Sequence, residues 1–180
     1  VPGGTDIPVT RENRLSYIYL ITRYRLSTQI EDQSRAFLQG LTELINPRWL
    51  RLFNTEELRV LVTGADTPID VEDLRRNTVY GGYHEKDMAV QYFWEALSSL
   101  DQASLKAFLR FVTSSPNPPL LGFSELNPKF AIRHAGDDIT RLPTASTCVN
   151  LLKLPAYNST AQCLEKVKYA IYSGAGFDLS

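Results

Sequence analysis

The feature that most constrains the fold is a change in the spacing of apolar residues partway along the chain. Up to about residue 113, apolar side chains recur every three or four positions, which is typical of amphipathic helices. After the Pro-rich stretch 114–119 the pattern differs: the segment 130–134 alternates with a period near two, and 148–154 is a compact apolar run. Both favour β-strands. The sequence therefore predicts an α+β protein, with an all-helical part joined to a mixed α/β part.

Caps and turn residues define the limits of the expected helices. The predicted helices span 11–26, 29–44, 54–62, 71–76, 87–97 and 102–112, and a last helix follows Asn158-Ser159 and ends at Gly174 and Gly176. Thr10 is the expected N-cap of the first helix. The glycines of Tyr80-Gly81-Gly82-Tyr83 predict a turn.

Two further expectations concern the middle of the chain. An apolar group after the second helix is expected to be buried, and it comprises Trp49, Leu50, Leu52 and Phe53. The short segment 65–68 contains a proline and lies between one closed helix and the next cap, so it is the predicted boundary between the two parts.

Composition excludes several classes of protein. The 180 residues carry 19 basic and 20 acidic side chains, a formal charge of −1, which argues against a basic nucleic-acid surface and an acidic disordered tail. No apolar run approaches the roughly 18 residues of a membrane span. The N-terminus, Val1-Pro2-Gly3-Gly4, has neither an initiator Met nor a signal-peptide core, so the chain is expected to be part of a longer protein.

The chain has only two cysteines, Cys148 and Cys163, and two histidines. These are too few ligands for a disulfide framework or a structural zinc site, so neither a metal nor another cofactor is expected. The composition predicts an intracellular, reducing compartment, cytoplasmic or nuclear.

Cys148 is the candidate nucleophile. It follows the small and hydroxylic residues of 142–147, which predict a loop leading into a strand. Backbone N–H groups and the Thr147 hydroxyl at such a junction favour the nucleophilic thiolate. The alternative for Cys148 is a buried, inert thiol. Cys163, in the last helix beside Leu164, is expected to have no role in the chemistry, whether it lies in the core or on the surface. A cysteine hydrolase would further need His134 as its base.

Several segments resemble one family. The run Leu-Pro-Thr-Ala-Ser-Thr-Cys-Val-Asn-Leu-Leu-Lys-Leu-Pro-Ala-Tyr at 142–157 resembles the catalytic stretch of HECT-type E3 ubiquitin ligases, and the tail 174–177 resembles their C-terminal signature. The segments 9–13, 93–95 and 109–113 fit in order and spacing. Ala-Ser-Thr-Cys at 145–148 and Pro-Leu-Leu-Gly-Phe at 119–123 are most similar to the branch associated with proteasomes and chain extension. Many family members have His where this chain has Ser146.

The resemblance implies two lobes. Residues 1–64 would form the C-terminal, helical part of the N-lobe, 65–68 the hinge and 69–180 the C-lobe with its catalytic cysteine. The front of the N-lobe and the subdomain that binds the E2 conjugating enzyme would precede Val1. The isolated chain is therefore not expected to have full activity.

The resemblance also implies a reaction, in which Cys148 accepts ubiquitin from an E2 as a thioester and passes it to a lysine of a protein substrate. The implied partners are ubiquitin, an E2, substrates and the proteasome. Supporting roles fall to Leu142, Pro143, Thr147 and Asn150 around the cysteine, and to Phe177, which would dock against a neighbouring lobe or fill the core of its own. A tail carboxylate, Asp178 or that of Ser180, is a candidate base for the lysine. The alternative to catalysis is a module that only binds ubiquitin or a proteasome surface.

Overall fold

The computed structural model describes residues 3–64 and 66–173, and the chain divides into two compact units, Val1–Asn54 and Thr55–Ser180. The predicted hinge at 65–68 lies inside the second unit, and the position of a hinge between lobes stays a prediction. Within the described residues, no helix combines the length and the apolar character needed to cross a membrane.

The first unit is helical. Its elements are a short 3-10 turn at Gly4–Asp6, α1 (Arg14–Arg23) continued by a π-helical turn at Tyr24–Thr28, α2 (Glu31–Leu44) and α3 (Pro47–Leu50). The two long predicted helices are confirmed, but Thr10 is not an N-cap. Its backbone N–H donates to Asn13 Oδ1 at 2.7 Å, and the helix begins only after Asn13.

The apolar group around α3 corrects another expectation. Trp49, Leu52 and Phe53 are 61%, 76% and 41% exposed, and Leu50 is half-buried, so the prediction that this group is buried is wrong. Apolar residues become buried only where a second layer of structure covers them, which local sequence does not reveal. None of the first unit's helices contains a buried residue among those described.

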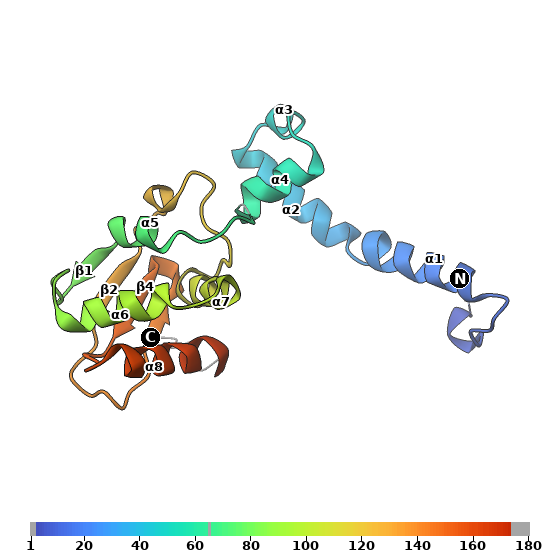
Figure 1. Ribbon diagram of the computed structural model, residues 1–180. Helices are drawn as coiled ribbons and strands as arrows, with labels where there is room; N and C mark the ends of the chain where they lie inside the picture. Colours follow the sequence, from blue (N-terminus) through green and yellow to red (C-terminus); the bar gives the residue numbers. More distant parts are fainter. Residues whose placement is uncertain (1–2, 65, 174–180) are drawn as a thin grey trace. The chain divides into compact units, whose positions relative to one another are not determined.

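The second unit holds the mixed sheet and its helices (Figure 1). The helices are α4 (Thr55–Thr63), α5 (Val71–Arg76), α6 (Met88–Ser98), α7 (Gln102–Thr113) and α8 (Thr160–Ser173), and the strands are β1 (Val79–Gly81), β2 (Ala131–His134), β3 (Thr144–Ser146) and β4 (Leu151–Leu154). The strand order is β1-β2-β4-β3, with β1, β2 and β4 parallel and β3 antiparallel to β4. This arrangement confirms the predicted α+β class.

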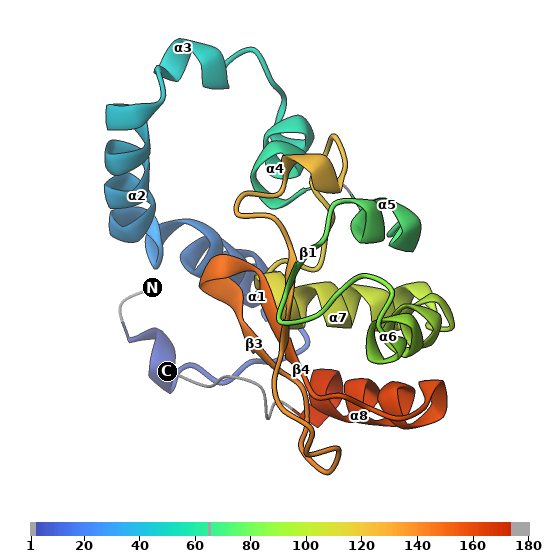
Figure 2. The ribbon, with the colours of Figure 1, turned by 90° about the vertical axis from the view of Figure 1, so that its left-hand side faces the viewer.

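One face of this sheet is covered by helices. Figure 2 shows α6, α7 and α8 on the same side of β3 and β4, and α7 contacts both strands as well as α8. Ile132 of β2 and Ala145 of β3 both pair with Leu152 of β4, and all three are buried. Removing these side chains from water is the main favourable contribution to the free energy of packing the helices on the sheet.

Two short strands depart from the predictions. Tyr80 and Gly81 belong to β1 rather than to a turn, since β1 pairs with β2 about fifty residues later. The segment 144–146, predicted as loop, forms β3 because β4 pairs with it. The predicted strand at 148–154 begins only at Leu151, because 147–149 forms a 3-10 turn. Short strands depend on a partner that is distant in sequence, so local pattern describes them poorly.

We predict that Phe108→Ala lowers the free energy of unfolding by about 3–5 kcal/mol, measured by urea denaturation. The Phe108 ring lies 5.9 Å from that of Phe93 and 6.1 Å from that of Phe130, and its truncation leaves a cavity between helix and sheet. The matched control is Tyr169→Ala on α8, a side chain that is 61% exposed, with an expected change within about 0.5 kcal/mol. A similar loss of unfolding free energy in both variants would contradict the placement of Phe108 in the core.

Candidate functional site

Cys148 lies at the tip of a tight hairpin. Strands β3 and β4 are paired as far as Ser146 and Leu151, and residues 147–150 connect them through the 3-10 turn Thr147–Val149. The Cys148 thiol is free and exposed, as is the neighbouring Val149 side chain, which is 49% exposed. The turn precedes the amino end of β4, so the thiol faces solvent from a rigid edge of the sheet.

Asn150 holds this turn in place. Its backbone is in the left-handed region, with φ 50° and ψ 42°, a conformation that Asn adopts more readily than other residues with a side chain. The Asn150 N–H donates to Thr147 O at 3.3 Å, and the side-chain Nδ2 donates to Pro128 O at 2.7 Å. The Asn150 carbonyl accepts from Ala131 N at 3.0 Å. The buried Asn150 therefore ties the Cys148 turn to the strand beside it.

The other residues expected to support the site lie on the approach to β3 or in the turn. Pro143 is buried, while Leu142 and Thr147 are half-buried. The structure thus brings Thr147 and Asn150 into one turn with the thiol. Leu142 and Pro143 precede Thr144, which pairs with Lys153, so they lie toward the opposite end of the hairpin from Cys148. Phe177, the tail carboxylates and the helix-ending glycines of the prediction lie outside the described residues.

The second cysteine, Cys163, is buried, whereas Cys148 is exposed. Cys163 in α8 has no exposed surface, and burial raises the pKa of its thiol to about 12. A thiol that is enclosed and protonated at neutral pH cannot act as a nucleophile. The structure places Cys163 in the core, and its lack of reactivity stays a prediction.

His134 lies at the other end of the sheet. It pairs with Leu154 at the carboxyl end of β4, whereas the Cys148 turn precedes the amino end of that strand. The three residue steps from Leu151 to Leu154 already span about 10 Å, beyond hydrogen-bond reach. His134 Nε2 instead lies 3.3 Å from Asp137 Oδ1, and its ring meets the Tyr83 ring edge-on at 4.8 Å. The interpretation of Cys148 and His134 as a hydrolase pair is therefore wrong.

The residues that sequence reasoning missed are Pro128 and Ala131, whose backbone groups hold Asn150. Every residue has a backbone carbonyl, so the sequence does not indicate which one bonds Asn150. The bond becomes apparent only once β2 is known to pair with β4. In the described part of the chain, no group of three or more His, Cys, Asp or Glu is arranged to hold a metal ion. An exposed thiol on a fixed turn suits acyl exchange between thiols, which needs only an accessible thiolate fraction.

Comparison with known proteins gives a consistent result. The family described as HECT-domain (ubiquitin-transferase) matches residues 1–180. The chain is 48% identical over 180 residues to E3 ubiquitin-protein ligase HUL5 of Saccharomyces cerevisiae, covering 100% of this chain and 20% of that protein. It is 45% identical over 186 residues to E3 ubiquitin-protein ligase UPL6 of Arabidopsis thaliana, covering 100% and 18%. It is 42% identical over 206 residues to human ubiquitin-protein ligase E3B, covering 100% and 19%.

The chain thus spans only about a fifth of the length of these curated relatives. The family predicted from the motif around Cys148 is confirmed. The association with proteasomes that the resemblance implies stays a prediction.

We predict that the two thiols react at widely different rates. In the native chain at pH 8, Ellman's reagent should modify Cys148 within minutes, while Cys163 should react only after denaturation, because it is buried and stays protonated. Absorbance at the thionitrobenzoate maximum measures both phases. In Cys148→Ala the fast phase should vanish, and a fast phase that persists there would contradict the assignment.

We also predict an order of stability at Asn150. Asn150→Ala should lower the free energy of unfolding by about 1–3 kcal/mol, because it loses the bond to Pro128 and forces a left-handed Ala. Asn150→Gly loses the same bond without the backbone strain, so it should be more stable than the Ala variant by about 1 kcal/mol. Urea denaturation measures both variants, and an Ala variant as stable as the Gly variant would refute the backbone argument.

Proposed function

We propose a function from the family: the chain belongs to the HECT-domain (ubiquitin-transferase) family. In this proposal it is the catalytic part of an E3 ubiquitin-protein ligase, and Cys148 is the ubiquitin acceptor. The observation that supports this most is the contrast between the two thiols: Cys148 is exposed on a turn fixed by Asn150, whereas Cys163 is enclosed. The partners in this proposal are ubiquitin, an E2 conjugating enzyme and protein substrates.

The first step exchanges one thioester for another. The Cys148 thiolate attacks the carbonyl carbon of the thioester between ubiquitin and the E2. A C–S bond to Cys148 forms as the C–S bond to the E2 cysteine breaks, and the E2 cysteine leaves as a thiolate that takes up the proton Cys148 gave to solvent. Because both thiols are cysteines, the exchange is nearly balanced in free energy, and the thiolate fraction and access limit its rate.

The second step forms an amide. A neutral lysine amine attacks the Cys148 thioester, a C–N bond forms, the C–S bond breaks, and Cys148 leaves as a thiolate while the amine loses its proton to a base. At pH 7, deprotonating a lysine of pKa about 10.4 costs about 4.6 kcal/mol. Holding the amine against the thioester offsets much of this cost. Asp178 or the Ser180 carboxylate as the base, and Phe177 as a docking residue, remain part of this proposal.

We predict that Cys148→Ala abolishes a reducible ubiquitin adduct. The measurement is a single-turnover reaction of the chain with an E2 already charged with ubiquitin, quenched without reductant and resolved with and without dithiothreitol. The unmodified chain should gain one ubiquitin that dithiothreitol releases, because the bond is a thioester. The adduct should form faster in a version extended at the N-terminus to include the E2-binding subdomain.

The matched control is Cys163→Ala, which should still form the adduct because Cys163 is buried in α8. An adduct that persists in Cys148→Ala would overturn the assignment. Ubiquitin that binds the chain equally well with or without Cys148, and never forms a covalent product, would support the binding-module alternative instead.

A further inference from the structure

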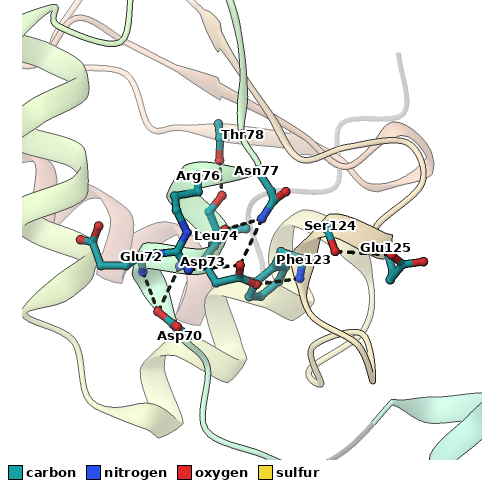
Figure 3. Close-up of polar contacts among 10 residues, drawn as sticks. All are labelled: Asp70, Glu72, Asp73, Leu74, Arg76, Asn77, Thr78, Phe123, Ser124 and Glu125. Carbon is teal, nitrogen blue, oxygen red and sulfur yellow. Dashed lines mark hydrogen bonds and ion pairs between the residues drawn. The ribbon is translucent and has the colours of Figure 1, made fainter.

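A carboxylate in α5 holds a loop that is distant from it in sequence. Asp73 Oδ2 accepts a hydrogen bond from the Phe123 backbone N–H at 2.8 Å, and Asp73 Oδ1 accepts from Asn77 Nδ2 at 3.2 Å (Figure 3). Phe123 begins the 3-10 turn Phe123–Glu125, where the first N–H groups have no partner within the turn. Asp73 thus supplies, from another element, the cap that this turn lacks.

The fit between Asp73 and the loop is close. Gly122 has a φ of +94°, and a Cβ at this position would lie 3.1 Å from Asp73 Oδ2. The Phe123 side chain is 2% exposed and is part of the core. Backbone and side chain therefore fix the start of the segment 122–131, which we call the strap.

The strap ends at the Cys148 turn. Lys129 Nζ donates to Ser124 O at 2.7 Å, which closes the strap on itself. Pro128 O then accepts from Asn150 Nδ2, and Ala131 N donates to Asn150 O. These are the two hydrogen bonds that hold Asn150 from outside its own turn.

Between its buried ends the strap contacts the core through Leu126. Ser124, Glu125 and residues 127–129 are exposed, and Leu126 is half-buried between the buried Phe123 and Phe130. The anchors of such a segment decide where its carbonyl groups lie. The position of Pro128 O depends on both ends of the strap: Phe130 is buried and its carbonyl accepts from Val79 N, and Asp73 holds the start at Phe123.

We propose that Asp73 is a positioning residue for the Cys148 turn, acting through the strap and Asn150. It does not touch the reacting atoms. The consequence for ubiquitin transfer rests on the proposed function, but the consequence for Asn150 does not, and the two can be measured separately.

The test compares Asp73→Ala with the unmodified chain. In ¹⁵N-labelled protein, the Asn150 side-chain amide protons should exchange with solvent about tenfold faster in the variant, because the bond to Pro128 O opens more often. Asp73→Asn keeps an acceptor oxygen of the same reach, so it should restore most of the protection.

A second readout is the acceptance of ubiquitin by Cys148 from a ubiquitin thioester of a small thiol, without an E2. This rate should fall about fivefold in Asp73→Ala, while alkylation of Cys148 by iodoacetamide should change less than about twofold. Alkylation requires only exposure, whereas thioester exchange with a protein requires the turn to be oriented.

Two controls separate positioning from general destabilisation. Ser159→Ala removes an acceptor for the Gln162 N–H at the start of α8 and should lower the melting temperature without affecting the Asn150 amide. Glu72→Gln removes the neighbouring exposed charge on α5 and should change neither readout.

The proposal is overturned if Asn150 protection is unchanged in folded Asp73→Ala, or if Ser159→Ala reduces it equally. If the unmodified chain accepts no ubiquitin, the proposed function fails, and the Asn150 amide still decides whether Asp73 positions the turn.

Discussion

The hydrogen bonds of Asn150 are the constraint on which the candidate site depends. They join the Cys148 turn to the strap and to β2, which follows the strap directly and lies about twenty residues before the turn in the sequence. Without them the turn would be an ordinary exposed hairpin end, since Cys148 and Val149 bury little surface of their own. The left-handed backbone at this position explains why the residue is Asn, which tolerates the conformation and still offers a side-chain donor.

The long helices were predictable from sequence for physical reasons, whereas Cys148 was singled out by its resemblance to a family motif and its role stays a prediction. Helices such as α6 and α7 carry their signal locally, as apolar residues repeated over three turns, and the different surroundings of Cys148 and Cys163 follow from a loop and a helix face. The strands β1 and β3 were not predictable, because three residues specify a strand only once a partner is present. The predicted burial of Trp49 was wrong for a related reason, because burial requires contact with elements outside its own stretch of sequence.

The proposed reaction uses a thiol that has no histidine beside it. Ser146 stands two residues before Cys148, and His134 lies at the opposite end of β4. Exchange between two thioesters makes small demands on a base, so a fixed and exposed thiol is sufficient for the proposed first step. The demanding step is the attack by lysine, for which orientation of the Cys148 turn by Asn150 and, in our proposal, by Asp73 would matter most.

The central claim is that Cys148 is the residue of this chain that bonds to the C-terminus of ubiquitin. The most direct measurement is to react the chain with ubiquitin that ends in an electrophilic group, digest the product and locate the cross-link by mass spectrometry. We expect one cross-link, on the peptide that contains Cys148. A cross-link on Cys163 or on a lysine, or none at all, would contradict it.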